Sequence, residues 1–252
     1  MTMFKEKNQQ YRLFLFGFLT TNFIWFLFSL IYNTSIIPDP IEVYRRIPVL
    51  LGDGIAVHIG YSLFRIGTGI LLALLVGVPT GISMAYSTRI QRYLYPFIYF
   101  SYPIPKTALL PVAMLLMGMR DGSKISIIFL ILVFQVVVSV RDSVEQIDIT
   151  TYQVIRSAGA TRRDVVRHVT LPAILPNLLT SIRISLGTAL SVLFFIEGYG
   201  TKFGMGYYIL DAWSRINYIQ MYLGILVLAL VGFLLFLMMD LLESYLCVWN
   251  KN

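Results

Sequence analysis

The strongest constraint on this chain is its series of long apolar segments, which contain almost no charge. A helix needs about 20 mainly apolar residues to cross the hydrocarbon core of a bilayer. Residues 13–31 alone meet that length, and the uncharged stretch continues to Pro38. Five further apolar segments cover residues 55–86, 93–119, 125–140, 174–196 and 219–239. The sequence therefore predicts an all-α, polytopic membrane protein with about six transmembrane helices.

Composition leaves no room for a large soluble domain beside these helices. Of the 252 residues, 57% are hydrophobic and 13% are charged, against about 45–50% and about 25% in soluble proteins. Six spans use roughly 120 to 140 positions, so that little more than loops remains. We expect a single membrane domain over residues 1–252.

The amino-terminal segment has two interpretations. Lys5, Lys7 and Arg12 precede it, as basic residues precede the apolar region of a secretory signal peptide. The segment is longer than that region, and no small-x-small cleavage site follows it. The sequence therefore favours an uncleaved helix within residues 1–35.

Residues that usually carry metal, haem or nucleotide chemistry are scarce in this sequence. Cys247 is the only cysteine, and His58 and His168 are the only histidines. This pattern argues against an internal disulfide and against a multi-cysteine or His-Glu-x-x-His metal site. No Gly-Lys pair occurs, which excludes a Walker-type phosphate-binding loop. We expect no metal, no cofactor and no enzymatic activity; if the protein uses ATP, another chain binds it.

The net charge of +7 informs membrane topology, and we expect no nucleic acid partner. Basic residues concentrate in the cytoplasmic loops of membrane proteins. With a cytoplasmic amino terminus, the inner side collects Lys5, Lys7, Arg12, Arg89, Arg92, Arg141, Arg156, Arg162, Arg163, Arg167 and Lys251. The outer side holds Arg45, Arg46, Arg120, Lys124, Lys202 and Arg215. We therefore expect a multi-pass protein of the cell membrane with both termini in the cytoplasm.

The longest inner loop, residues 141–173, is polar and basic and begins with a predicted short helix. Thr150 and Thr151 are expected to cap this helix, and Gly159 stands where a left-handed residue ends one. Ile155 and Ala158 give the helix an apolar ridge.

A second short helix is predicted directly after the first. Thr161 and Asp164 form a capping box, and an apolar stripe follows until Leu171-Pro172, which is expected to end the helix. Such a bent helix pair fits a groove on a partner protein through its apolar residues. The alternative is an amphipathic pair that lies on anionic lipid.

The same loop resembles the signature loop of binding-protein-dependent ABC importer permeases. Gly159, nine further residues and Val169-Thr170-Leu171-Pro172 match its second half, which is usually written Gly, nine residues, Ile-x-Leu-Pro. Gln153-Val154-Ile155 stand where Glu-Ala-Ala is usual, so the acidic residue is missing. Further parts resemble the nitrate, sulfonate, taurine and bicarbonate branch of the family: Pro38-Asp39-Pro40, Ser62-Leu63-x-Arg65, Pro79-x-Gly81, Pro103-Ile104-Pro105-Lys106, Leu110-Pro111, and Glu197 with Phe203-Gly204-Met205-Gly206-Tyr207.

The resemblance implies a type I ABC importer permease. Residues 55–245 are then the permease core, residues 1–35 an accessory helix and residues 141–173 the cytoplasmic coupling loop. The implied partners are ABC ATPase subunits, a second permease subunit that is identical or a sibling, an extracytoplasmic substrate-binding protein and membrane lipid. The implied ATPase-coupling residues are Gln153, Val154, Ile155, Ala158, Gly159, Ala160, Val169, Leu171 and Pro172.

Three basic residues fall inside apolar segments, namely Arg65, Lys106 and Arg183. Each costs about 2.5 to 3.5 kcal/mol near a helix centre unless it is paired or hydrated. Lys106 lies where prolines interrupt its helix, so it either guides an anion along the pathway or stabilises the bend. Arg65 and Arg183 either line the pathway or form buried pairs, and nearby glycines would permit close helix contacts there: Gly67, Gly69 and Gly187.

Glu197 ends the fifth apolar segment, just before a glycine-rich stretch. It is a fourth candidate for the translocation pathway, as a gate or a binding-protein contact, or it is only a polar residue at the outer interface. Together these features predict a permease subunit that imports a small anionic solute, with ATP hydrolysed by subunits docked around Gly159. The alternative is a stand-alone secondary transporter or channel whose inner loop binds lipid or regulates transport.

Overall fold

The computed structural model describes residues 2–50, 52 and 54–250. All regular elements in this part of the chain are helices, which confirms the predicted all-α class. Among the described residues, five helices are long and apolar enough to cross a membrane, and a bent helix pair makes a possible sixth span. Lys251 and the side chains of Lys5, Lys7 and Arg12, which were counted for topology, lie outside the described residues.

The chain divides into two compact units, and residues 1–56 with 208–227 form the first. Its elements are α1 (Thr2–Tyr32), α2 (Pro40–Arg45), α3 (Ile47–Leu50), most of α11 (Met205–Ser214) and the first part of α12 (Tyr218–Leu246). Within this unit, the ring of Trp25 stacks on Tyr222 with centroids 5.2 Å apart. The apolar side chains of α1 from Leu13 onward are largely exposed, as expected for a helix that contacts lipid.

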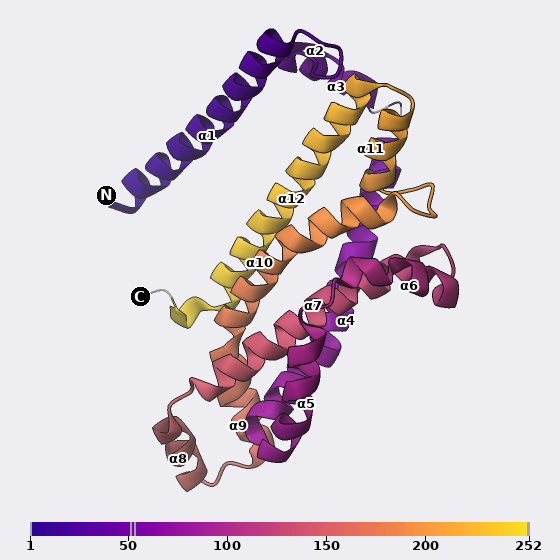
Figure 1. Ribbon diagram of the computed structural model, residues 1–252. Coiled ribbons are helices and arrows are strands. Elements are labelled where there is room, and N and C mark those ends of the chain that lie inside the picture. Colours follow the sequence, from indigo (N-terminus) through magenta and orange to yellow (C-terminus); the bar gives the residue numbers. More distant parts are fainter. Residues whose placement is uncertain (1, 51, 53, 251–252) are drawn as a thin grey trace. The chain divides into compact units, whose positions relative to one another are not determined.

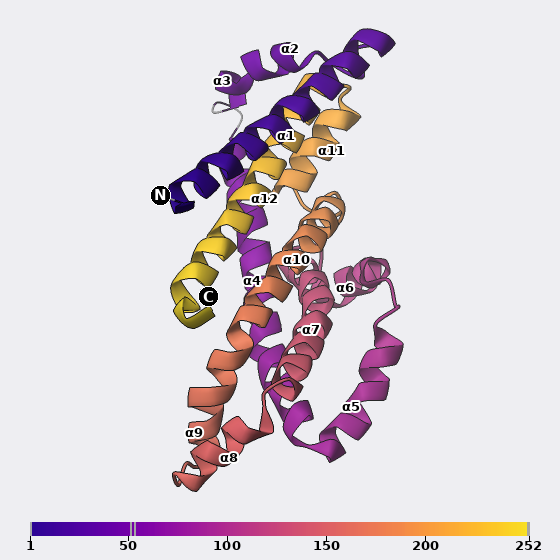
Figure 2. The same ribbon diagram turned by 90° about the vertical axis from the view of Figure 1, so that its left-hand side faces the viewer.

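Residues 57–207 with 228–250 form the second unit, which contains every residue of the predicted coupling loop and pathway. Its elements are α4 (Ile55–Tyr86), α5 (Thr88–Ser101), η1 (Lys106–Leu109), α6 (Leu110–Met117), α7 (Asp121–Glu145), α8 (Ile149–Ser157), α9 (Arg162–Val165), η2 (Val166–Thr170), α10 (Leu171–Glu197), the end of α12 and η3 (Val248–Asn250). Figures 1 and 2 show α8 and α9 together at one end of this unit, where α4 also ends.

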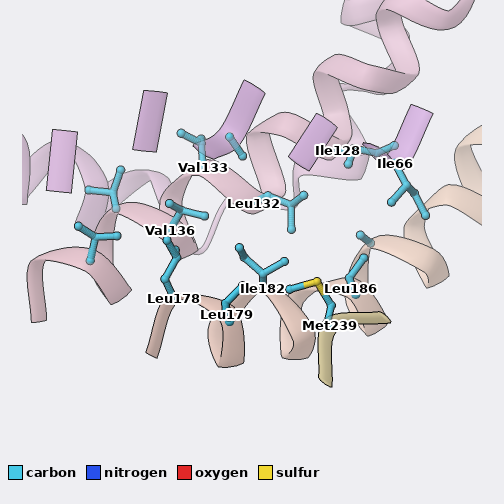
Figure 3. Close-up of a cluster of buried hydrophobic side chains, with 14 of the residues drawn as sticks. Ile66, Ile128, Leu132, Val133, Val136, Leu178, Leu179, Ile182, Leu186 and Met239 are labelled. Carbon is cyan, nitrogen blue, oxygen red and sulfur yellow. The ribbon is translucent and has the colours of Figure 1, made fainter. Parts of the chain in front are cut away.

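The core of the second unit lies between α7 and α10. Buried aliphatic side chains of the two helices face each other along their length, including Leu132 and Val136 on α7 and Ile182 and Leu186 on α10 (Figure 3). Met239, near the end of α12, joins the same cluster. α7 and α10 therefore form the central pair on which the other helices of this unit pack.

A stripe of small residues brings α4 close to α7. Gly69, Ala73, Gly77 and Gly81 are four residues apart and lie on one face of α4, and all are buried. A Cβ atom at Gly81 would lie 2.7 Å from the backbone oxygen of Val137. The expected close contact at Gly69 is present, because a Cβ there would lie 2.5 Å from the side chain of Ile128. The expectation for Gly67 is wrong, since this residue faces away from α7 and is exposed.

The predicted span at residues 93–119 is interrupted, as the prolines in its sequence indicated. The helix pair Thr88–Ser101 and Lys106–Met117 bends by 87°. Proline at positions 103 and 105 cannot donate the backbone hydrogen bonds that would continue α5, which explains the break. Backbone without helical hydrogen bonds is tolerated at membrane depth only in contact with protein or a water-filled cavity.

Lys124 also differs from its prediction as a loop residue. It lies in the first turn of α7 and is fully buried, and its Nζ donates a hydrogen bond to the backbone oxygen of Met119 at 2.7 Å. α7 starts at Asp121, four residues earlier than the apolar segment, because hydropathy alone does not detect a helical turn that contains charged residues.

We predict opposite effects of one methyl group at two glycines of α4. Alanine is favoured over glycine in a helix interior by about 0.5–1 kcal/mol. Gly67→Ala should therefore raise the thermal stability of the detergent-purified protein, since no described heavy atom beyond its chain neighbours and the backbone of its own helix lies within 4 Å of the added Cβ. Gly81→Ala should lower it, because the helices must separate. Size-exclusion chromatography after heating measures both, and a shift of the same sign at both positions would contradict this packing.

Candidate functional site

The first helix of the loop between α7 and α10 begins at Asp148, not at the predicted threonines. Asp148 has non-helical backbone angles, and its carboxylate accepts a hydrogen bond from the backbone N–H of Thr150 at 2.9 Å. Thr150 and Thr151 already lie inside α8 and cannot cap it. The hydrogen bonds from Thr150 lower the pKa of Asp148 below its usual value, so this cap is charged at neutral pH.

The predicted end of α8 is confirmed. Gly159 has a φ angle of +85°, in the left-handed region that favours glycine. Its N–H donates to the oxygen of Arg156, and the N–H of Ala160 donates to the oxygen of Ile155. This pair of bonds is a Schellman motif, which uses the last free carbonyl groups of the helix.

The predicted capping box is also confirmed, but the second helix does not end where expected. The side chain of Thr161 accepts a hydrogen bond from the N–H of Asp164, and the Asp164 carboxylate accepts one from the N–H of Thr161. Leu171-Pro172 does not stop the helix, which continues through one π-turn, η2, into α10. Proline clashes with the carbonyl group four residues before it in an α-helix, and the wider turn provides room for the ring.

We call residues 148–170 the loop module, because α8, α9 and η2 share a small apolar core. Tyr152, Val165 and Val169 are buried in it, and Ile147, Ile155 and Ala160 pack against them. The predicted ridge of Ile155 and Ala158 is therefore divided, since Ile155 faces this core and Ala158 is exposed.

The predicted coupling residues fall into two groups. Gln153, Val154, Ala158 and Gly159 are exposed, with 68% of Val154 accessible, and the nearby Ile149 is exposed to a similar degree. Ile155, Ala160, Val169 and Pro172 are partly or fully buried, and Leu171 is 41% exposed at the start of α10. The first group lies on the surface of the loop, and most of the second group packs beneath that surface.

At the opposite end of the same unit, Arg65 lies in a buried cluster of charges that joins α4, α7 and α10. Its side chain is 1% exposed. The guanidinium donates to Glu197 at 2.7 Å and to Asp121 at 2.8 Å, and also to Thr201 and to the backbone oxygen of Phe203. With these bonds, all N–H donors of the guanidinium are used. Arg65 thus holds the start of α7, the end of α10 and the loop that follows.

Glu197 is fully buried in this cluster. Its carboxylate also accepts hydrogen bonds from the hydroxyl of Ser62 and from the backbone N–H of Gly206 at 2.9 Å. A Cβ atom at Gly204 would lie 2.4 Å from the Glu197 carboxyl carbon, so only glycine fits there. In this structure Glu197 and Arg65 bind each other and the loop at residues 198–206, which we call the glycine loop.

The other two intramembrane cations are also partnered. Arg183 on α10 pairs with Asp240 at 2.7 Å and with Glu243, both on the last part of α12. The Nζ of Lys106 donates to the backbone oxygens of Ser101 and Tyr102, at 2.6 and 2.7 Å, where α5 ends. The ammonium group of Lys106 also lies 5.6 Å from the ring centroid of Tyr102 and 5.1 Å from that of Phe134, in cation–π contacts.

An open cavity of about 690 Å³ lies beside the charge cluster. Tyr61 and Phe203 form one wall, with stacked rings 4.8 Å apart. Arg65, Arg120 and Lys202 line it together with a single carboxylate, Asp121. The lining therefore carries an excess of positive charge.

Sequence reasoning missed several residues that complete these sites. It assigned no role to Asp121 and none to Ser62 beyond the family resemblance, although both bind the Arg65–Glu197 pair. The only available signal for Asp121 was a charge directly before an apolar segment. Tyr86, Tyr152 and Thr170, which bind one another through their hydroxyl groups, were missed because they are far apart in the sequence.

We predict that the buried pair at Arg65 contributes much more to stability than an exposed pair. Arg65→Met leaves the buried Glu197 carboxylate without its counter-charge, which should reduce the free energy of unfolding by about 3–5 kcal/mol. Arg215→Met removes an exposed pair with Asp211 and should cost at most about 1 kcal/mol. Thermal melting of the purified variants compares the two, and equal losses would contradict the structural role of Arg65.

The amino-acid sequence of this chain is similar to those of known proteins. Residues 77–246 match the family model described as binding-protein-dependent transport system inner membrane component. The chain is 31% identical to the putative aliphatic sulfonates transport permease protein SsuC of Bacillus subtilis, over 88% of this chain and 81% of that protein. It is 30% identical to the taurine transport system permease protein TauC of Escherichia coli, over 85% and 80%. The formylaminopyrimidine transport permease protein ThiX of Halalkalibacterium halodurans is 27% identical, over 93% and 94%.

Solved structures show the same fold. A chain of the MetNI methionine ABC transporter in an inward-facing conformation has a TM-score of 0.67 at 18% identity, over 80% of this chain and 98% of that one. A chain of a bacterial ABC transporter involved in the import of alginate has a TM-score of 0.60 at 18% identity, over 98% and 99%. These likenesses confirm the predicted type I importer permease architecture. The chain belongs to the family of inner membrane components of binding-protein-dependent transport systems, as an ABC transporter permease.

Proposed function

We propose that this chain forms the translocation pathway of an ATP-driven importer for a small anionic solute. An extracytoplasmic binding protein delivers the solute, and separate ABC ATPase subunits dock on the loop module. Two permease subunits, identical or siblings, enclose the pathway. Both termini and the loop module face the cytoplasm, and residues 1–35 serve as an accessory helix beside the permease core of residues 55–245.

The observation that carries this proposal is the exposed surface of α8, which presents two apolar side chains. Val154 and Ile149 are each about two-thirds exposed, whereas the ends of α8 are capped and its other apolar side chains pack in the core of the loop module. An amphipathic helix whose apolar residues point outward fits a groove on a partner. The internal packing of the loop module keeps this face in one orientation, which lowers the entropic cost of docking.

Gln153 stands where relatives usually have an acidic residue, so docking here rests mainly on apolar contact. Gln153 is exposed next to Val154. Its amide can both donate and accept hydrogen bonds with the ATPase, without the charge of a carboxylate. The exposed arginines of the loop, Arg156, Arg162, Arg163 and Arg167, supply the attraction to a partner with acidic groups or to the lipid headgroups.

The anionic cargo is supported by the relatives and by the charge of one cavity. SsuC and TauC are named for aliphatic sulfonates and taurine, which carry a sulfonate group. The open cavity beside Arg65 offers Arg120 and Lys202 on its lining, and its wall of Tyr61 and Phe203 suits the apolar part of such a solute. Lys106 is partly exposed at the bend between α5 and η1, where its positive charge can attract a passing anion.

The four pathway candidates then have different tasks. Lys106 is the one proposed to meet the solute directly. Arg65 and Glu197 shape the pathway by holding the glycine loop, and Arg183 does so by holding α12 to α10. Glu197 does not line the cavity, and a solute would reach it only after this cluster opens.

We predict that Gly159→Val abolishes uptake while the protein still inserts in the membrane. A β-branched residue strongly disfavours the left-handed conformation at this position, so the end of α8 must rearrange and the docking face with it. Gly159→Asn should retain uptake, because asparagine tolerates this conformation. Uptake in cells and the amount of ATPase that co-purifies are the two measurements. Full uptake by the valine variant would contradict docking through this turn.

We further predict that gentle purification from the native membrane yields the chain together with an ABC ATPase. The small molecule held in the co-purified binding protein, identified by mass spectrometry, is expected to carry a sulfonate or another anionic group. A neutral aminopyrimidine in its place would assign the chain to a ThiX-like cargo instead. Vesicles that contain this chain alone should not concentrate solute. If they did so with an ion gradient, the protein would be a secondary transporter.

A further inference from the structure

Three hydroxyl groups from separate segments meet where the loop module joins the membrane helices. Tyr86 ends α4, Tyr152 lies in α8 and Thr170 ends the π-turn η2. The Tyr86 hydroxyl donates to the Tyr152 hydroxyl at 3.3 Å and shares a hydrogen bond of 2.5 Å with the Thr170 hydroxyl. The two tyrosine rings meet edge to face, with centroids 6.2 Å apart. The three residues thus form one continuous contact between α8, α4 and the start of α10.

The two residues of the loop module in this contact are buried. Thr170 is fully buried, and Tyr152 is 9% exposed in the apolar core with Val165 and Val169. Burial and then the hydrogen bond with Tyr86 raise the pKa of Tyr152 to about 12. The phenol is therefore neutral at physiological pH and keeps its proton for hydrogen bonding. A movement of α8 must either carry these groups along or break their hydrogen bonds.

Thr170 lies at an interruption in the long helical run from Arg162 to Glu197. In η2 the N–H of Leu171 bonds to the oxygen of Val166, five residues back, and the Thr170 hydroxyl reaches the oxygen of Val165 at 3.4 Å. Pro172 follows and has no N–H to donate. A helix bends most easily where its regular hydrogen bonds are interrupted. The π-turn is therefore the natural hinge between the loop module and α10.

We propose that Tyr86, Tyr152 and Thr170 form a hydroxyl link that transmits movement of α8 to the π-turn of α10 and to the end of α4. This inference rests on the proposed function, because the docked ATPase supplies the movement. The three residues are positioning residues, since none of them touches solute or nucleotide. Through the link, a shift of α8 turns α10 at its hinge, and α10 carries Glu197 and the glycine loop at its far end.

The test separates transmission from docking. Tyr86→Phe removes the central hydroxyl without changing the ring, and Thr170→Val removes its second partner at nearly constant volume. Tyr93→Phe is the matched control at the start of α5, because the Tyr93 side chain is 75% exposed and its hydroxyl forms no hydrogen bond with any described residue. The complex of permease, ATPase and binding protein is reconstituted in vesicles, and solute uptake and ATP hydrolysis are measured together.

We expect Tyr86→Phe and Thr170→Val each to lower the solute imported per ATP about fivefold, the factor that corresponds to one net hydrogen bond. The amount of bound ATPase and the melting temperature should stay close to those of the unmodified complex. The double variant should lose little more than either single variant, because both changes break the same link. Tyr93→Phe should import as much solute per ATP as the unmodified complex.

Two results would overturn the inference alone: unchanged import per ATP in both variants, or loss of the ATPase from the complex, which would assign the residues to docking. If Tyr86→Phe fails to fold, Tyr152→Phe breaks the same link from the loop side and is judged by the same ratio. If the unmodified chain binds no ATPase, the proposed function fails, and the inference fails with it.

Discussion

Burial of charge in an apolar surrounding is the constraint on which this structure depends. A lone charge inside a membrane helix is costly, and Arg65 meets this cost by binding two carboxylates, a hydroxyl group and a backbone oxygen at once. Its partners come from α7, α10 and the glycine loop, so one side chain determines how three segments meet. The close packing of α4 on α7 at Gly69, one helical turn from Arg65, brings the two helices near enough for these contacts. The arrangement of helices at this end therefore depends on a single cluster.

A different physical principle determines the structure of the loop module, at the opposite end of this unit. The loop module lies among polar groups, and its backbone is satisfied locally by the Asp148 cap, the Schellman motif at Gly159 and the capping box of Thr161. Its small core turns Tyr152 inward and leaves Val154 outside. The result is a stiff body with an apolar outer face, attached to the membrane helices through a π-turn. A stiff body on a hinge is suited to receive force from a partner, whereas a flexible linker would absorb it.

Predictions from the sequence agree with the structure wherever the contacts that determine the local conformation lie within a few residues. The apolar segments, Gly159 and the Thr161–Asp164 box belong to this group, and so does the family motif that ends at Pro172. Predictions differ from the structure where a second sequence signal lies nearby, or where a contact between distant residues determines the local structure. Asp148 precedes the threonines and caps α8 first, and the π-turn carries the helix past Leu171-Pro172. Lys124 was assigned to a loop because its buried position depends on the fold around it.

The sequence by itself determined the membrane class, the order of the apolar helices, the turn at Gly159 and the family, because hydropathy, chain stereochemistry and motif spacing are local properties. Only the tertiary structure decided the partners of the charges. Arg65 binds Glu197, which is 132 positions away, Arg183 binds α12, and Lys106 turns back to the end of the preceding helix, α5. The same holds for the link of Tyr86 to Thr170, 84 positions apart. Such pairs form when distant helices pack together, and no local pattern specifies which polar group will lie within hydrogen-bonding distance.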